Sequence, residues 1–447
     1  MSLRLSISGA RGIVGEDINP CFLNDLLFAF HKFIPQGSVL LGSDTRGSGE
    51  PISHIIEGIL RMLGRDVMYV GKLPTPTICL ATKELGCAGG IAVTASHNPA
   101  RWNGIKLVGS DGLFLPNEFW NEFADSKFEK FDFVPYDKIG GKQLNYDCVQ
   151  MHIEKILSLP FVDSFAIRKA NLRVAYDGVG GAGPSVMIPL FQKLGVEYGA
   201  IGIGMDGKFI HSPEPVPKNL DMLGDLVMHY NADIGFANDP DADRLAIVDE
   251  NGKPIGEEFT IALAVYRVLS QKLSDVVVNL STSTLVDFVA DKFGAKVHRT
   301  PVGEYWVTRK ILELGAEIGG EGNGGVIVPA VHPARDSFVA VSLICSLLAE
   351  SGKKLSQIVA EFPQKYIMKD KIPFSGDFSK IANSILDEFS PDEKILTDGV
   401  WFRTDGGFIH IRPSNTEPII RIIVEDSDEK TAQSIVDRAK NLIEKNI

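Results

Sequence analysis

The sequence is poor in cysteine: the chain has five among its 447 residues, and they are scattered along it. Their number is odd and no two of them form a CxxC pair, which argues against a structural zinc site and against a disulfide framework. Long apolar runs are also missing, since none approaches the ~20 residues of a membrane-spanning helix. The first residues, MSLRLSISGARG, do not have the apolar core of a signal peptide. We therefore expect a cytoplasmic protein with no membrane as partner.

Positive charge is in short supply. The chain has 45 lysine and arginine residues against 57 aspartate and glutamate residues, which gives a formal net charge of −12. This excess of negative charge disfavours nucleic acid and anionic membranes as partners. An anionic small molecule would need a local positive site to overcome it. The hydrophobic content of 44% and the charged content of 23% are those of an ordinary globular protein.

An α/β pattern is present three times. The stretches SVLLGSDTRGSG (38–49), NLRVAYDGVGGAG (171–183) and DVVVNLSTSTLV (275–286) share one plan. In each, an apolar strand is followed by Asp or Asn, and then by a Gly/Ser-rich turn that opens a helix. Short apolar strands separated by helices are typical of βαβ units in parallel or mixed sheets. The recurrence predicts three related α/β domains.

The end of the sequence follows a different plan. VWFRTDGGFIHIRP predicts two strands around the turn 404–407, IIRIIVE predicts a third strand, and the last residues predict an amphipathic helix. This is the pattern of a smaller α+β domain. The predicted fold class is therefore α/β with four domains, of which three have mixed sheets and the last is α+β. Their predicted extents are 1–145, 146–250, 251–365 and 366–447.

The stretch FANDPDADRLAIVDENG places three aspartates, Asp239, Asp241 and Asp243, at alternate positions of one tight loop. Three carboxylates that converge in this way suit a hard divalent cation. An EF-hand is the competing interpretation, because Glu250 falls at the twelfth position of such a loop. However, Arg244 occupies the sixth position, where that loop turns on glycine, and the sequence continues as the strand LAIVD. We therefore predict a metal loop of another kind.

Two other loops carry polar side chains where a strand ends. VTASHNPARWNGIKL (93–107) places Ser96 and His97 just after the apolar segment GGIAV, with Lys106 ten residues further along. GGEGNGG (319–325) surrounds Glu321 and Asn323 with glycines that would let a ligand approach the backbone closely. A carboxylate and an amide in that place suit sugar hydroxyls, although a plain turn is an equally good interpretation of the glycines alone.

The loop RPSNTEPIIR (412–421) combines groups that bind phosphate. Arg412 and Arg421 bracket Ser414, Asn415 and Thr416, so that a guanidinium, hydroxyls and an amide lie close together along the chain. Such a set can hold a phosphate in a bidentate manner. Ser, Asn and Thr are also ordinary turn formers, so the loop alone does not decide between a phosphate site and a plain turn.

Arg11 is a further basic residue, and it stands alone among the glycines of SGARGIVG.

Taken together, these motifs resemble those of the α-D-phosphohexomutase family. TASHNP resembles the family's phosphoserine loop, DPDADR its metal loop, GEGNGG its sugar-recognition loop and RPSNTEP its phosphate-binding loop. They occur in the family's order, and the resemblance covers essentially the whole chain. It implies four domains around one central cleft, with three related α/β domains first, which agrees with the repeated pattern.

The resemblance also implies a role for each matching residue. The metal ligands for Mg²⁺ would be Asp239, Asp241, Asp243 and the phosphorylated side chain of Ser96. The catalytic residues would be Ser96, His97, Lys106 and Arg11. The residues that bind the substrate would be Arg244, Glu321, Asn323, Arg412, Ser414, Asn415, Thr416 and Arg421.

The activity that the resemblance implies is that of an isomerase, a phosphohexomutase. Such an enzyme moves a phosphoryl group between O6 and O1 of a hexose through the phosphoserine and a hexose 1,6-bisphosphate, with glucose 1,6-bisphosphate as activator. Asn323 and Gly325 stand where many members have serine and histidine, and SGARG departs from the FGTDGxRG form of bacterial phosphoglucosamine mutases. GEGNGG with RPSNTEP is more similar to a subgroup assigned to glucosamine, mannose and glucose phosphates. Among these we favour glucosamine phosphate.

Two rival functions use the same residues differently. A Mg²⁺-dependent sugar phosphatase would pass the phosphoryl group from Ser96 to water, but it has no need of a second phosphate site such as RPSNTEP. A non-catalytic binding protein for sugar phosphates would need neither Ser96 nor the aspartates. The expected partner is in every case a small hexose phosphate, and the sequence leaves open whether the chain is a monomer or a homodimer.

Overall fold

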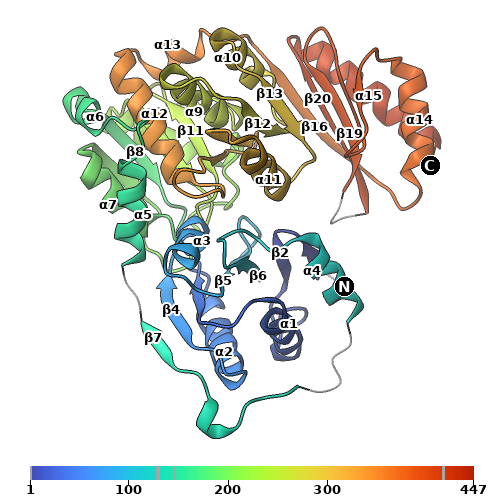
Figure 1. Cartoon of the computed structure of the whole chain (residues 1–447). Coiled ribbons are helices and arrows are strands. Elements are labelled where there is room, and N and C mark those ends of the chain that lie inside the picture. Colours follow the sequence, from blue (N-terminus) through green and yellow to red (C-terminus); the bar gives the residue numbers. More distant parts are fainter. Residues whose placement is uncertain (1–2, 127–130, 145–146, 415–417, 447) are drawn as a thin grey trace.

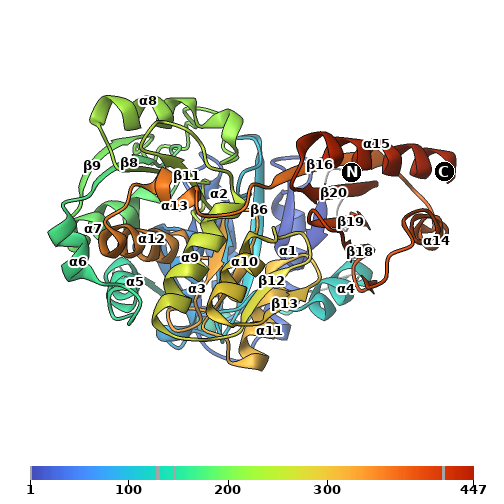
Figure 2. The same ribbon diagram turned by 90° about the horizontal axis from the view of Figure 1, so that it is seen from above.

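The computed structural model describes residues 3–126, 131–144, 147–414 and 418–446, and these form four sheets with flanking helices. In Figure 1 the first domain lies at the bottom, the second and third lie above it, and the fourth projects to the right. Figure 2, seen from above, shows the fourth domain as a separate lobe beside the other three. None of the described helices is long and apolar enough to cross a membrane.

The first domain is built on a mixed sheet with the strand order β1-β2-β6-β5-β3-β4-β7. Its strands are β1 (Arg4–Ser6), β2 (Gly9–Ile13), β3 (Val39–Ser43), β4 (Val67–Lys72), β5 (Gly89–Val93), β6 (Trp102–Gly109) and β7 (Lys142–Leu144). Its helices are α1 (Pro20–Phe33), α2 (Gly49–Met62), α3 (Thr75–Glu84) and α4 (Asn117–Asp125). β3, β4, β5 and β7 are parallel, whereas β6 runs antiparallel to β5 and so forms a hairpin with it.

The second and third domains repeat a smaller version of this plan, with orders β11-β10-β8-β9 and β13-β12-β14-β15. The second contains β8 (Arg173–Asp177), β9 (Glu197–Ile201), β10 (Ile234–Asn238), β11 (Leu245–Asp249), α5 (Cys148–Leu157), α6 (Ser164–Ala170), α7 (Pro184–Leu194) and α8 (Asp221–Tyr230). The third contains β12 (Val276–Asn279), β13 (Val297–Thr300), β14 (Ile318–Glu321), β15 (Gly325–Ile327), α9 (Glu258–Gln271), α10 (Leu285–Phe293), α11 (Glu304–Leu314), α12 (Ser337–Ser351) and α13 (Leu355–Val359).

The fourth domain is an antiparallel sheet with the order β16-β20-β19-β18-β17. It contains β16 (Tyr366–Pro373), β17 (Lys394–Ile395), β18 (Val400–Arg403), β19 (Phe408–Pro413), β20 (Ile419–Asp426), α14 (Phe378–Phe389) and α15 (Glu429–Asn446). The predicted fold class, three α/β domains with mixed sheets and a smaller α+β domain at the end, is confirmed. In each of the three repeated stretches a strand is followed by a turn that leads into a helix, as the sequence pattern predicts: β3 to α2, β8 to α7 and β12 to α10.

The apolar cores do not follow the sheets one for one. A single cluster of buried side chains extends from Ile153 in α5 to Phe362 after α13, and it includes the buried faces of α9 and α12. The second and third domains therefore share a core, because α12 packs against α5, α6 and α7 as well as α9. The first and fourth domains have main clusters of their own, and smaller apolar clusters join each of them to the third domain.

Candidate active site

Ser96 lies in the loop of the β5–β6 hairpin, in a backbone conformation that serine seldom adopts. Its φ is +51°, in the left-handed region, and its side chain is buried. The loop is held by a short chain of hydrogen bonds, in which Ser96 N donates to Thr94 Oγ1 (3.0 Å) and Thr94 Oγ1 donates to Asp44 Oδ2 (2.7 Å). The hydroxyl of Ser96 donates to Asp239 Oδ2 at 2.7 Å, and His97 Nδ1 lies 3.3 Å from Ser96 Oγ. The structure thus brings the predicted nucleophile and the predicted metal loop into direct contact.

A buried arginine that the sequence analysis did not select fixes this loop. Arg46 belongs to the SDTRGSG turn after β3 and forms an ion pair with Asp44 through Nε at 3.0 Å. Its guanidinium also donates to four backbone carbonyls of the hairpin loop, those of Ser96 (2.5 Å), Asn98 (2.6 Å), Pro99 (2.9 Å) and Trp102 (3.2 Å). A planar fork of donors is suited to several acceptors at once. The motif SDTRGSG predicts a strand and a turn. The arginine within it is the feature of the sequence that could have indicated this role.

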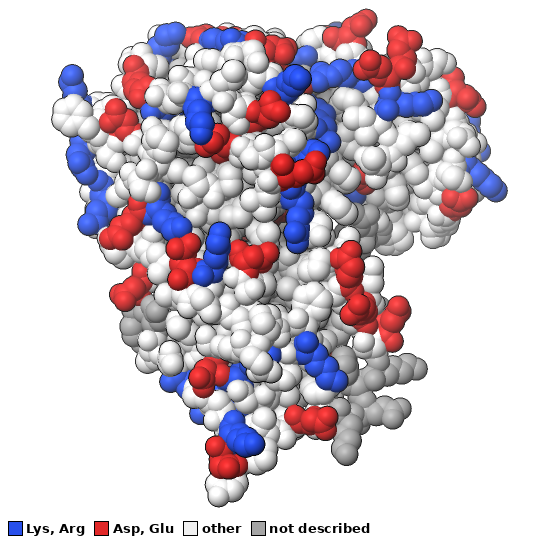
Figure 3. All heavy atoms as spheres, in the orientation of Figure 1, with Lys and Arg blue, Asp and Glu red and all other residues white. Residues whose placement is uncertain are grey.

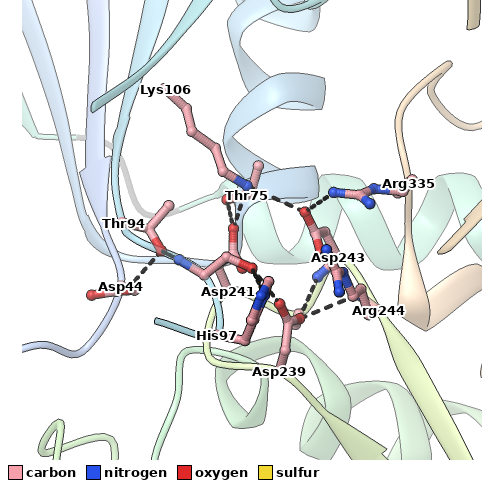
Figure 4. Close-up of polar contacts among 12 residues, drawn as sticks. Asp44, Thr75, Thr94, His97, Lys106, Asp239, Asp241, Asp243, Arg244 and Arg335 are labelled. Atoms are coloured by element: carbon pink, nitrogen blue, oxygen red, sulfur yellow. Dashed lines mark hydrogen bonds and ion pairs between the residues drawn. The ribbon is translucent and has the colours of Figure 1, made fainter. Parts of the chain in front are cut away.

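Asp239, Asp241 and Asp243 occupy the turn between β10 and β11, and all three are buried (Figure 4). A carboxylate oxygen of each lies within 4.8 Å of the others. Asp239 Oδ1 accepts from the backbone N–H of Asp243 and of Arg244, both at 3.2 Å, and Ala242 has a φ of +53°, so the turn is tight. The predicted clustering of the three carboxylates is therefore observed, in a strand–turn–strand setting that an EF-hand does not have.

Two of these carboxylates have an oxygen suited to a cation. Among the described residues, Asp241 Oδ1 and Asp243 Oδ1 are buried without a hydrogen-bond donor. A buried carboxylate oxygen without a partner is costly, because it loses its water and receives nothing in return. A divalent cation with a preference for oxygen ligands would satisfy both oxygens together with Asp239 Oδ2. The residues present thus fit Mg²⁺ by the chemistry of their donors.

The opposite oxygens of the triad are held by cations and a hydroxyl. Lys106 on β6 is buried, and its Nζ donates to Asp241 Oδ2 (2.6 Å) and Asp243 Oδ2 (3.2 Å) (Figure 4). Thr75, the first residue of α3, donates from Oγ1 to Asp241 Oδ2 at 2.5 Å. Because β6 pairs with β5, the hairpin that presents Ser96 also delivers Lys106 to the metal loop.

Burial and charge set the protonation of the triad. Burial, reinforced by the charges of Asp243 and Asp241, raises the pKa of Asp239 well above its usual range. Burial also acts to raise the pKa of Asp243, but Arg335 and Lys106 outweigh it, so the pKa of this carboxyl lies below its usual range. The triad therefore depends on neighbouring positive charge, which a bound cation would supply in greater measure.

His97 and the two arginines beside it complete the positive side of the site. Burial, together with the charges of Arg244 and Arg11, lowers the pKa of His97 to about 2. Arg11 on β2 lies 3.4 Å from Asn98 Oδ1 through Nη1, and Arg244 Nε lies 3.8 Å from Asp243 Oδ1. All the residues predicted to be catalytic or metal-ligating are thus gathered at the junction of the first two domains.

Arg335 is a second functional residue that sequence reasoning missed. It precedes α12, is buried, and donates from Nη2 to Asp243 Oδ2 (2.7 Å) and from Nη1 to Glu321 Oε2 (2.8 Å). Its Nε forms an ion pair with Glu304 Oε2 at 3.1 Å. One guanidinium therefore joins the metal loop of the second domain to the sugar-recognition loop of the third. In the sequence it is an ordinary arginine in HPARDS, and no motif marks it.

Glu321, at the end of β14, is surrounded by donors. Oε1 accepts from Asn279 Nδ2 (2.7 Å) and Gly303 N (3.1 Å), and Oε2 accepts from Asn323 Nδ2 (3.3 Å) in addition to Arg335. The predicted pair Glu321 and Asn323 is thus one hydrogen-bonded unit, connected to the metal loop through Arg335.

The predicted phosphate-binding loop lies between β19 and β20 of the fourth domain. Arg412 is paired with Arg421 across the two strands, and Ser414 N donates to Ile419 O at 2.8 Å. Arg412 Nε forms an ion pair with Asp398 at 2.8 Å. Asn415 and Thr416, which were also predicted to bind substrate, lie outside the described residues. Over the face seen in Figure 3, several Lys and Arg side chains lie where the fourth domain meets the third, near β16, with Asp and Glu side chains beside them.

Comparison with known proteins gives matches along the whole chain. Models of the phosphoglucomutase/phosphomannomutase family match by domain: alpha/beta/alpha domain I over residues 5–131, domain II over 150–252, domain III over 256–366 and the C-terminal domain over 382–442. A phosphoglucomutase/phosphomannomutase of Thermococcus kodakarensis is 36% identical over 446 residues, which cover 98% of this chain and 97% of the relative. A phosphoglucosamine/phosphogalactosamine mutase of Sulfurisphaera tokodaii is 31% identical, with 98% of each chain covered.

Solved structures agree with this at the level of the fold. A phosphoglucomutase/phosphomannomutase family protein from Burkholderia thailandensis superimposes with a TM-score of 0.83 at 23% identity, and covers 98% of this chain and 96% of its own. The four family domains follow one another in the order that the sequence motifs predict. The chain therefore belongs to the phosphoglucomutase/phosphomannomutase family, the α-D-phosphohexomutases, and is an isomerase of that kind.

Proposed function

We propose that this phosphohexomutase acts on glucosamine phosphate, and that it moves the phosphoryl group between O6 and O1 through phosphorylated Ser96. The observation that carries the proposal is the 2.7 Å contact between Ser96 Oγ and Asp239 inside a buried carboxylate triad. The name of the Sulfurisphaera tokodaii relative supports an amino sugar as substrate. The name of the more similar Thermococcus kodakarensis relative supports glucose and mannose phosphates as the second candidate.

In the proposed cycle, the bond between phosphorus and Ser96 Oγ breaks while a bond forms from phosphorus to the free hydroxyl of the bound hexose monophosphate. The proton that the hydroxyl loses passes by way of His97, whose Nδ1 lies 3.3 Å from Ser96 Oγ, to this leaving oxygen. A phosphoryl group on Ser96 adds about −1.5 to −2 charges. Burial is the first cause of the low pKa of His97, and the charges of Arg244 and Arg11 come next. The phosphoryl charge opposes that of the two arginines and so favours uptake of the proton by the ring. The bisphosphate then turns over, and Ser96 takes the other phosphate.

Transfer of a phosphoryl group asks mainly for positioning and for stabilisation of charge. Mg²⁺, held by the aspartate triad and a phosphoserine oxygen, would neutralise charge on the transferring group. Three aspartates and one Mg²⁺ together leave a charge of −1, so the protein must supply more. Lys106, Arg11, Arg244 and Arg335 stand around the triad and provide it. This local excess of positive charge lets a chain of net charge −12 accept a dianionic substrate.

The two ends of the substrate would be held by different domains. One phosphate would lie on the loop that starts at Arg412, while the other end faces Ser96. Glu321 and Asn323 would meet the sugar hydroxyls between them. Glucose 1,6-bisphosphate, as activator, would restore the phosphate of any Ser96 that has lost it.

The test is ³¹P NMR of the protein with Mg²⁺ and a catalytic amount of glucose 1,6-bisphosphate, given glucosamine 6-phosphate, mannose 1-phosphate or glucose 1-phosphate in turn. We expect the isomeric phosphomonoester resonance to grow fastest with glucosamine 6-phosphate. A faster reaction with either of the others would reassign the substrate. Growth of inorganic phosphate alone would mean that water is the acceptor and would replace the mutase by a phosphatase. Ser96→Ala, which we expect to fold normally, serves as the inactive control.

A further inference from the structure

The phosphate-binding loop lies on a different sheet from Ser96, so contacts between domains must set its position. Asp398, between β17 and β18 of the same sheet, contacts both Arg412 and the third domain with one carboxylate. Oδ1 accepts from Arg412 Nε at 2.8 Å, and Oδ2 accepts from the backbone N–H of Val302, in the third domain, at 2.9 Å. The side chain of Asp398 is 10% exposed and that of Arg412 is 6% exposed, so water competes little for either contact.

The segment that receives Asp398 also holds the sugar-recognition loop. Val302 N donates to Asp398, and the next donor, Gly303 N, donates to Glu321 Oε1 at 3.1 Å. Gly303 has a φ of +129°, a conformation that residues with a side chain rarely adopt, and it allows the two successive N–H groups to serve carboxylates from different domains. Movement of Arg412 away from Glu321 would therefore break either the bond between Asp398 and Val302 or the bond between Asp398 and Arg412.

A buried histidine supports Asp398 from behind. His410 Nε2 lies 2.7 Å from the backbone oxygen of Asp398, and its Nδ1 lies 2.9 Å from Ser281 Oγ in the third domain. Burial lowers the pKa of His410 to about 4, so the ring is neutral near pH 7. Its Nε2–H then donates to Asp398 O, and Nδ1 accepts from Ser281. Both the backbone and the side chain of Asp398 are thus fixed against the third domain.

We propose that Asp398 is a positioning residue for the mutase reaction: it orients the guanidinium of Arg412 and ties it to the segment of the third domain that also holds Glu321. The inference rests on the proposed role of Arg412 as a phosphate ligand. Its chemical basis is that Arg412 Nε and Val302 N are both donors, so the residue between them must accept twice. Asparagine has nearly the same shape but one acceptor oxygen, and its amide would set an N–H against another N–H.

The experiment compares the steady-state kinetics of Asp398→Asn with those of wild-type protein, using the hexose phosphate that reacts fastest. Loss of a charge-assisted hydrogen bond to a phosphate ligand predicts a KM about 10- to 100-fold higher, with a smaller change in kcat. Asp392→Asn, which changes an exposed aspartate of the same domain, is the matched control and should leave both parameters unchanged. Thermal melts confirm that each variant is folded, and Asp398→Glu, one methylene too long, replaces Asp398→Asn if the latter does not fold.

A double variant separates positioning from other roles. If Asp398 acts through Arg412, then Asp398→Asn combined with Arg412→Ala should have the KM of Arg412→Ala alone. Multiplied effects in the double variant, or a wild-type KM in Asp398→Asn, would overturn the inference while the mutase activity stands. A wild-type KM in Arg412→Ala would instead remove this loop from the substrate site. Failure of the wild-type protein to move phosphate between positions would overturn the proposed function itself.

Discussion

Arg335 offers a sharp test of how charge is balanced at the active site. The change is Arg335→Met, which keeps most of the side-chain length and removes the guanidinium. In the native structure this group contacts Asp243 at 2.7 Å, Glu321 at 2.8 Å and Glu304 at 3.1 Å, and it is 6% exposed. Removing one partner of a buried ion pair costs about 3–5 kcal/mol, because the remaining charge stays buried and uncompensated. We expect a loss of stability of that order in the absence of divalent cations.

The distinctive expectation concerns Mg²⁺. Two unit charges about 4 Å apart interact with about 4 kcal/mol at an effective dielectric constant of 20, so the loss of a cation beside Asp243 makes the triad a stronger cation site. A tenfold gain in affinity recovers about 1.4 kcal/mol once both proteins are saturated. The variant should therefore be less stable than wild type in EDTA and should gain more from Mg²⁺.

The assay is the midpoint of thermal unfolding in EDTA and in saturating Mg²⁺. Arg267→Met is the matched control, because Arg267 is also buried, is paired with Glu350 at 2.5 Å and lies on α9 rather than at the triad. It should be destabilised and yet show the wild-type response to Mg²⁺. If Mg²⁺ raises the thermal midpoint of Arg335→Met no more than that of Arg267→Met, then Arg335 does not share Asp243 with the cation. The inferred balance of charge around the triad would then be wrong.

Three further predictions test other parts of the site. Arg46→Met removes the guanidinium that holds four carbonyls of the loop around Ser96. Steady-state kinetics should therefore show kcat about 100-fold lower, with little change in KM. Equal changes in both parameters would contradict a role in positioning Ser96. Burial raises the pKa of Glu258 to about 8 from 4.5, despite nearby Lys369, so the native carboxyl retains its proton while the unfolded one ionises. The stability of the wild-type protein should hence fall between pH 5 and pH 8 relative to that of Glu258→Gln. Thermal midpoints that change with pH in the same way in both proteins would refute the raised pKa of Glu258. Removal of Mg²⁺ by EDTA should stop transfer reversibly while mass spectrometry still finds phosphate on Ser96.

The parts of the site that are local in sequence could be predicted from it. Asp239, Asp241 and Asp243 lie within one turn, so their spacing alone predicts that the carboxylates converge. Ser96 and Lys106 lie on one hairpin, and the short separation between them keeps both at the same end of a sheet. Residues this close in sequence have few ways to lie far apart in the fold, so the sequence pattern alone predicts that they meet.

The residues that sequence reasoning missed act over long separations. Arg335 reaches Asp243 from 92 positions away, and Arg46 reaches Ser96 from 50 positions away. Buried arginines of this kind follow no spacing rule, because the fold decides which carboxylate or carbonyl they meet. Asp398 is similar, since its contact with Val302 exists only once two domains are packed together. The common core of the second and third domains was also invisible to a pattern that treats each repeat as a separate unit.

The left-handed backbone at Ser96, the proposed nucleophile, restricts which amino acid could serve at this position. Threonine carries the same hydroxyl, but its branched β-carbon makes a φ of +51° a strained choice, at about 1–2 kcal/mol. A cysteine would tolerate the turn no better than serine, and it would place a soft sulfur donor where a hard oxygen donor is needed. The turn that exposes the hydroxyl thus also selects the smallest side chain able to carry it, and catalysis and backbone geometry favour the same residue.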